Sequence, residues 1–149
     1  MSGGGLPTRR SLLGGAALLA SRPARAEDET LTFETLYSGW GVRGLVFSDR
    51  VKALAGRRVG MRGYMAPPLK AESPFFVLTR EPLSLCPFCQ SDAEWPVDIV
   101  VIYLRRAGTL VGAGEPVRVL GRLDIGSWTD PESGFVSLLR LVDAEYRRA

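Results

Sequence analysis

The chain contains two cysteines, Cys86 and Cys89, which stand in a C-P-F-C motif. Two carboxylates follow closely, at Asp92 and Glu94. The chain contains no histidine, which excludes Ser-His-Asp hydrolases, Cys-His proteases and histidine-ligated metal or haem sites. The two thiols are therefore the main candidates for a reactive centre. At this spacing they have three chemical uses: a local disulfide, thiol–disulfide exchange, or the binding of a metal ion.

A disulfide between Cys86 and Cys89 would staple the loop between two strands. The loop that it closes is short, so we expect a modest stabilisation of about 1–3 kcal/mol.

Thiol–disulfide exchange would use the same pair. In thioredoxin-like proteins, which carry a C-P-x-C motif, the reactive cysteine begins a long helix whose dipole stabilises the thiolate. Here seven residues, 90–96, separate Cys89 from the next expected strand, and this stretch ends in proline. At most two helical turns fit, so the helix that activates the thiol in that class is not expected.

Metal binding would join both thiolates of Cys86 and Cys89 to the carboxylate of Asp92 or Glu94. Such a set could hold Zn²⁺, and the thiolates alone could hold Cu(I). Structural zinc sites usually take four Cys and His ligands, more than this chain supplies. A zinc or copper ion would therefore be bound transiently, or with further ligands from a partner protein. All three uses of the cysteine pair stay open at this point.

The first 26 residues have the features of an export signal. Arg9 and Arg10 precede a short apolar run, and Ala24 and Ala26 fit a small-x-small cleavage site. The apolar run has nine residues, far below the roughly 20 that cross a bilayer. The arginine pair resembles a twin-arginine signal, with an ordinary secretory signal as the alternative. We therefore expect a periplasmic protein with no transmembrane segment in its mature chain.

Removal of residues 1–26 would change the charge of the protein. The whole chain of 149 residues has 19 basic and 16 acidic residues, a net charge of +3. Four of the arginines and none of the acids lie in the signal, which leaves 15 basic and 16 acidic residues, a net charge of −1. A nearly neutral, exported chain is not expected to bind nucleic acid. The remaining 123 residues are enough for one domain.

The pattern of apolar residues predicts an all-β fold. Residues 27–44 are expected to form a lead-in and a first strand, and residues 45–149 the main domain. The expected strands are Leu31–Tyr37, Arg57–Met65, Phe75–Thr79, Val97–Leu104, Val117–Ile125 and Phe135–Val142. One short helix is expected over Ser48–Leu54 and a polar tail over Asp143–Ala149. Five to six short strands without strand–helix–strand alternation favour a small OB-like antiparallel barrel.

Three short motifs resemble those of a family of uncharacterised exported bacterial proteins. The run from Gly56 to Pro67 matches G-[KR]-x-V-x-x-x-G-[YF]-x-x-P, and Phe76-Val77-Leu78 and Val117–Leu123 match the family's F-x-L and V-x-V-x-G-x-L strands. The resemblance implies a small β-barrel, often associated with ABC-transporter components, some of them linked to metal supply. Many members have a single cysteine where this chain has C-P-F-C. Physically, Gly63 in the first motif is expected to permit a close backbone approach or a bulge.

Together these observations predict an exported accessory or binding protein that supports an ABC-transport or metal-handling system through the Cys86–Cys89 loop. The alternative is a periplasmic thiol–disulfide oxidoreductase that uses the same pair. Two further features carry less weight. Trp40 and Trp128 could line a barrel mouth, and the Arg105-Arg106 pair is expected to lie in solvent at a strand end.

Overall fold

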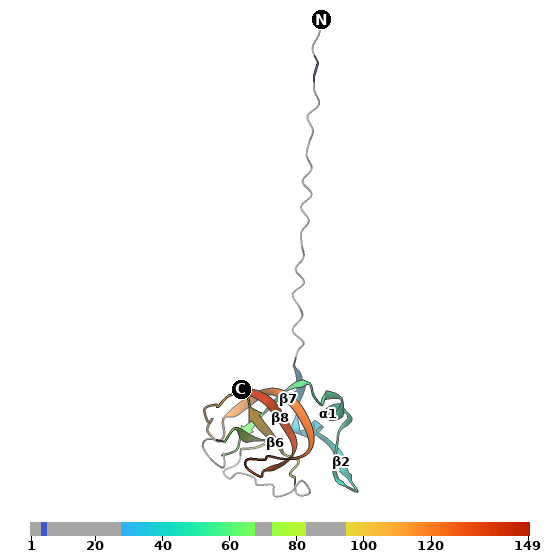
Figure 1. Cartoon of the computed structure of the whole chain (residues 1–149), viewed down its shortest axis with the longest axis vertical. Coiled ribbons are helices and arrows are strands. Elements are labelled where there is room, and N and C mark those ends of the chain that lie inside the picture. The colour runs from blue at the N-terminus through green and yellow to red at the C-terminus, as the bar shows by residue number, and fades with distance from the viewer. Residues whose placement is uncertain (1–3, 6–27, 68–72, 83–94) are drawn as a thin grey trace.

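The structure, a computed structural model, describes residues 4–5, 28–67, 73–82 and 95–149. Its strands are β1 (Glu29–Leu31), β2 (Tyr37–Gly41), β3 (Gly44–Phe47), β4 (Arg58–Met65), β5 (Phe75–Thr79), β6 (Ile99–Leu104), β7 (Pro116–Thr129) and β8 (Val136–Arg148). One helix, α1 (Asp49–Leu54), and one 3₁₀ turn, η1 (Phe33–Thr35), complete the described elements (Figure 1). Within the described residues, no helix is long and apolar enough to cross a membrane.

Five strands pair in a ring, as an OB-like barrel requires. The ring runs from β4 through β5, β6, β8 and β7 and back to β4. All these pairings are antiparallel except that of β6 with β8. The joint between β4 and β5 consists of two residue pairs, Tyr64↔Thr79 and Met65↔Leu78, so the barrel is only partly closed there. The expected all-β, OB-like fold is confirmed.

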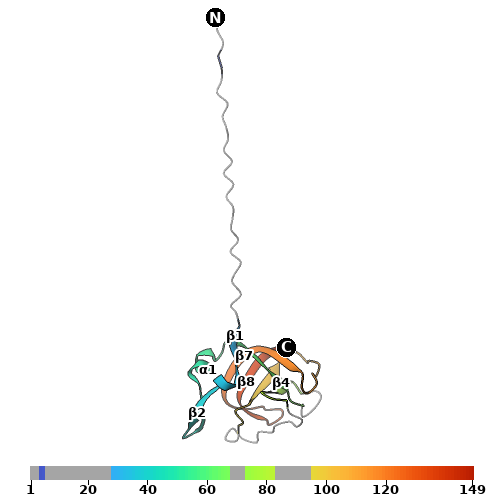
Figure 2. The same cartoon turned by 180° about the vertical axis from the view of Figure 1, so that it is seen from behind.

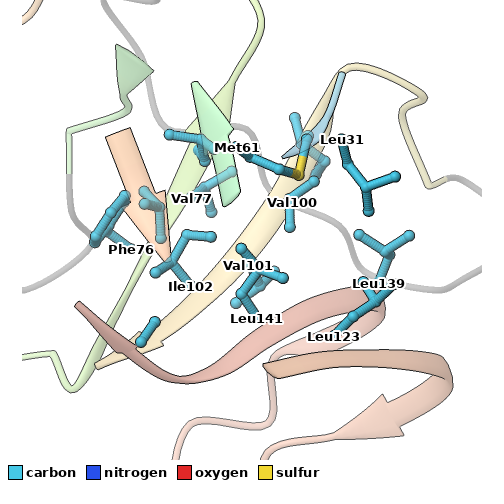
Figure 3. Close-up of a cluster of buried hydrophobic side chains, with 14 of the residues drawn as sticks. Leu31, Met61, Phe76, Val77, Val100, Val101, Ile102, Leu123, Leu139 and Leu141 are labelled. Carbon is cyan, nitrogen blue, oxygen red and sulfur yellow. The ribbon is translucent and has the colours of Figure 1, made fainter. Parts of the chain in front are cut away.

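The barrel core is formed by side chains from every strand of the ring. Figure 3 shows Met61, Phe76, Ile102 and Leu141 among the side chains that converge there. In β6 the first four residues, Ile99–Ile102, are each at most 2% exposed, as the unbroken apolar run predicts for a strand covered on both faces. The alternation expected in β4 is also present, because Val59 and Met61 are buried and Arg58 and Arg62 are exposed.

The close backbone approach expected at Gly63 is present at the joint between β4 and β5. A Cβ atom on Gly63 would lie 2.6 Å from the carbonyl oxygen of Thr79 and 2.9 Å from Cγ of Leu78. No side chain fits in this space. The glycine of the G-Y-x-x-P run therefore permits the ring to close.

The short helix over Ser48–Leu54 is confirmed as α1. Ser48 is its N-cap, and the Ser48 hydroxyl accepts a hydrogen bond from the backbone N–H of Val51 at 3.2 Å. The Ser48 hydroxyl also donates to the carbonyl oxygen of Thr35 at 2.6 Å. These contacts attach the helix to the segment that precedes β2.

The expected strand over Leu31–Tyr37 is wrong. The chain instead leaves β1 at Leu31 and turns through η1. The Thr35 hydroxyl donates to the carbonyl oxygen of Thr32 at 2.9 Å and accepts from the Thr32 backbone N–H at 3.3 Å. These local bonds offer the backbone an alternative to a strand ladder, and they allow Phe33 and Leu36 to be buried together on one side of the turn.

The hairpin of β2 and β3 is not predicted by the sequence pattern. It projects from the body of the barrel in both views (Figure 1 and Figure 2). Among the described residues its two strands pair only with each other. The hairpin contains several glycines, which are unfavourable in strands, so its sequence does not have a typical strand pattern. Gly44 has φ +104°, a conformation that suits glycine at the tight turn.

The polar tail expected over Asp143–Ala149 is also wrong, because β8 continues to Arg148. Asp143 has φ +49° and forms a β-bulge in this strand. A step of two residues along β6, from Ile102 to Leu104, is matched by a step of three along β8, from Leu141 to Ala144. The bulge shifts the alternation of polar and apolar residues, so the last part of the strand does not follow the pattern of the first.

Candidate functional site

The residues singled out for chemistry lie outside the described part of the chain. These are Cys86, Cys89, Asp92 and Glu94, together with Arg9, Arg10, Ala24 and Ala26 of the expected signal. The disulfide, exchange and metal uses of the cysteine pair therefore stay predictions. The structure does describe the residues on either side of the segment that contains the cysteines. We call these residues the first stem, which ends at Pro82, and the second stem, which begins at Trp95.

The first stem is held by a buried threonine. Thr79, at the end of β5, is 1% exposed. Its hydroxyl lies 2.6 Å from the carbonyl oxygen of Glu81 and 3.2 Å from that of Tyr64. The threonine therefore ties the residues that leave the barrel to the strand β4 beside it.

The second stem is held by a buried tryptophan. Trp95 is 2% exposed, and its indole Nε1–H donates to the hydroxyl of Tyr37 at 2.9 Å. The Tyr37 ring in turn stacks on Phe47, with ring centroids 5.6 Å apart. Burial of an indole with its polar N–H satisfied fixes the ring in place.

The two stems are also joined to each other. The backbone N–H of Arg80 donates to the carbonyl oxygen of Asp98 at 3.1 Å. The Arg80 guanidinium lies 3.4 Å from the Asp98 carboxylate, although both side chains are more than 40% exposed, so this ion pair adds little. The anchoring depends on the backbone bond and on Thr79 and Trp95.

A second feature is an open cavity of about 580 Å³ between residues 104–111 and the end of β8. Its apolar lining comes from Leu104, Leu110, Val111 and Ala144, and its charged lining from Arg105, Arg106, Glu145 and Arg148. The adjacent arginines were visible in the sequence. Their place at a cavity was not, because β8 forms the other wall and lies far along the chain.

A third cluster of charged groups surrounds Arg140, which is 3% exposed. Its guanidinium contacts the Asp124 carboxylate and two backbone carbonyls, and it lies 5.4 Å from the centre of the Trp128 ring. The edge of Trp128 meets Tyr103. Each guanidinium nitrogen donates at least one hydrogen bond, and the contacts join β6, β7 and β8. We interpret the cluster as structural.

Tyr103 and Asp130 form a hydrogen-bonded pair, with 3.3 Å between the Tyr103 hydroxyl and Oδ2 of Asp130. Burial, and then the nearby Asp130 charge, raise the pKa of Tyr103. Burial alone would raise the pKa of Asp130, but hydrogen bonds from the Glu132 and Ser133 backbones and from the Ser133 and Tyr103 side chains outweigh it. The pKa of Asp130 is therefore lower than usual. The carboxylate fixes the turn between β7 and β8, since its Oδ1 accepts from the Glu132 N–H at 2.9 Å.

The two tryptophans considered for a barrel mouth are both exposed, Trp40 to 68% and Trp128 to 40%. They stand on different elements, Trp40 in the β2–β3 hairpin and Trp128 near the end of β7. Trp128 packs on Arg140 and Tyr103, so part of its surface serves the structure.

The fold and the anchored stems define a small OB-like barrel with long loops between its strands. A crystal structure of a DUF3299 family protein from Pseudomonas aeruginosa is similar, with a TM-score of 0.52 and 14% sequence identity. The similarity covers 82% of this chain and 96% of that one, and at this identity it concerns the fold alone. No family model matches the chain, and no curated protein matches it.

Proposed function

We propose that this chain is an exported accessory protein that binds a metal ion through the Cys86–Cys89 loop. The observation that carries the proposal is the anchoring of both stems of that loop, by Thr79 at one side and by Trp95 at the other. Binding loops are commonly held by a rigid scaffold, because fixed ends lower the entropy lost when the ligand is bound.

The proposed ligand is a soft metal ion, Cu(I) or Zn²⁺. Thiolates are the preferred protein ligands of Cu(I), and Zn²⁺ accepts thiolates and carboxylates together. Asp92 and Glu94 follow Cys89 by three and five residues, so one of them could complete a zinc site. The proposed compartment is the periplasm, reached through the signal that includes Arg9 and Arg10. The association with ABC-transporter components stays a prediction.

The proposal is tested on protein purified from the periplasm under non-reducing conditions. Free thiols are titrated with a chromogenic disulfide reagent before and after chelation, and bound metal is measured by mass spectrometry. We expect close to one zinc or copper ion per chain, and two thiols that react only after the metal is removed. A variant with Cys86→Ser and Cys89→Ser should carry no metal and still fold.

Two other results would overturn the metal proposal. A disulfide with no metal and no activity in insulin reduction would leave only a structural staple. A disulfide that reduces and reforms in catalysis, with turnover of insulin, would establish the thiol–disulfide oxidoreductase. The double serine variant distinguishes this turnover from a contaminating enzyme.

A further inference from the structure

The open cavity beside β8 lies next to a β-bulge in that strand. The bulge at Asp143 places one extra residue in β8 relative to both of its neighbours, β6 and β7. Asp143 itself has φ +49°, which is uncommon for a residue with a side chain. As a result, the carbonyl oxygen of Ala144 accepts a hydrogen bond from the Arg105 backbone N–H at 3.0 Å. Bulges of this kind are common next to binding sites, where they redirect a strand.

The loop that forms the outer wall of the cavity is fixed on Tyr146. The Tyr146 hydroxyl donates a hydrogen bond to the carbonyl oxygen of Thr109. The Tyr146 ring packs edge-on against Phe76, with ring centroids 5.4 Å apart. A Cβ atom on Gly108 would lie within 3 Å of three atoms of the Tyr146 side chain. A side chain at position 108 would therefore have to displace the Tyr146 ring from its place against Phe76. These contacts with Tyr146 hold the wall of the cavity.

The charges at the cavity are unequal. Glu145 is paired with Arg58 at 2.8 Å, and Arg148 is paired with Glu115 at 3.0 Å. Among the described residues, the guanidinium groups of Arg105 and Arg106 have no hydrogen bond or ion pair. Among the described lining residues, the one carboxylate, Glu145, is thus already paired, while two of the three cations have no partner in the described part of the chain. The cavity therefore has an excess of positively charged side chains beside an apolar wall of Leu110, Val111 and Ala144.

We propose that this cavity binds a small organic anion, with a carboxylate or phosphate head on Arg105 and Arg106 and an apolar body against the wall. The planar guanidinium matches the oxygen geometry of both heads and forms charge-assisted hydrogen bonds to them. The volume of about 580 Å³ lies within the roughly 300–1,000 Å³ typical of small-molecule sites. The site is independent of the cysteine pair and does not rest on the metal proposal.

The test is isothermal titration calorimetry of the full purified chain with four probes: octyl phosphate, octanoate, inorganic phosphate and octanol. We expect saturable binding of at least one of the two octyl anions, and binding at least about tenfold weaker for inorganic phosphate and octanol. The comparison of octyl phosphate with octanoate identifies the preferred head group. Inorganic phosphate that binds as tightly as octyl phosphate would contradict a role for the apolar wall.

The matched variants are Arg105→Gln with Arg106→Gln, and Arg43→Gln with Arg57→Gln. Both pairs remove two positive charges from exposed arginines, and among the described residues neither Arg43 nor Arg57 has a side-chain partner. We expect the first pair to weaken binding of the octyl anion at least about tenfold and the second to change it less than about twofold. Circular dichroism verifies that both fold. Equal affinities in the two variants, or no saturable binding to the original chain at millimolar probe, would overturn the proposal.

Discussion

Nε and Nη2 of Arg140 both donate to one oxygen atom, Oδ2 of Asp124, at 3.0 and 2.9 Å. The two residues face each other across β7 and β8. Nη1 of the same arginine donates to the carbonyl oxygens of Gly126 and Ser137, each at 2.9 Å. The guanidinium therefore provides a hydrogen-bond donor to backbone carbonyl oxygens at the point where the pairing of β7 and β8 is irregular, between Ile125 and Trp128.

Replacement of this arginine should destabilise the barrel. Arg140→Met would leave the Gly126 and Ser137 carbonyls without this donor and Asp124 without its partner, and we expect a loss of about 2–4 kcal/mol in the free energy of unfolding. Urea denaturation measures it. Arg122→Met, on the exposed side of β7, is the control and should cost less than about 0.5 kcal/mol. A loss below about 1 kcal/mol for Arg140→Met would contradict the structural role.

The second prediction concerns the stability of a variant at Gly63, where β4 and β5 approach closely. Gly63→Ala would place a methyl group against the Thr79 carbonyl oxygen, a backbone atom that cannot rotate away. We expect a loss of about 1–3 kcal/mol, measured by thermal or urea unfolding. At Gly60 the nearest atom to an added Cβ is Cδ2 of Leu120 at 3.1 Å, the end of a flexible side chain. Gly60→Ala should therefore cost less, and an equal cost at both positions would refute the close approach.

The anchor of the first stem can be removed without changing the shape of the side chain. Thr79→Val deletes the hydroxyl, whose single hydrogen is donated to the nearer Glu81 carbonyl oxygen at 2.6 Å, and should cost about 1–2 kcal/mol. It should also raise hydrogen exchange at the backbone amides of Arg80 and Glu81. Thr129→Val, at an exposed position of β7, is the control. If the amides of Arg80 and Glu81 exchange alike in the two variants, Thr79 does not hold the stem.

The hydrogen bonds around Asp130 predict a pH dependence of stability. Its pKa in the folded chain is below the ordinary value of 3.8, so the unfolded chain binds the proton more tightly. The carboxylate therefore stabilises the fold above about pH 4, and this contribution is lost as the pH falls through the lowered pKa. The difference in unfolding free energy between the original chain and Asp130→Asn should shrink between pH 6 and pH 2. A difference that is constant over this range would show that the pKa is not lowered.

Regular hydrophobic patterns were enough to predict most of the barrel. Some sequence patterns follow directly from burial, such as the apolar run at Ile99–Leu104 and the alternation in Arg58–Met65. The N-cap at Ser48 follows from a local hydrogen bond. The 3₁₀ turn at Phe33–Thr35 was missed because the Thr35 side chain bonds the Thr32 backbone and so competes with the strand. The end of β8 was missed because the bulge at Asp143 changes which residues face the core.

The candidate sites differ in how much of them the sequence can reveal. A pair of cysteines is recognised by residue type and spacing alone, so Cys86 and Cys89 could be named at once. The cavity at Arg105 and Arg106 depends on contacts with Ala144 and Tyr146, about 40 residues later in the chain. No local pattern indicates such a contact.

The most direct test of the metal proposal is a competition titration of the reduced chain with Cu(I) and with Zn²⁺, against a chromophoric chelator. The account predicts one tight site per chain for at least one of these ions, lost in the variant with Cys86→Ser and Cys89→Ser. Asp92→Asn with Glu94→Gln should weaken Zn²⁺ more than Cu(I), because carboxylates are poor ligands for the softer ion. Equal, weak binding by the original chain and the double serine variant would contradict the account.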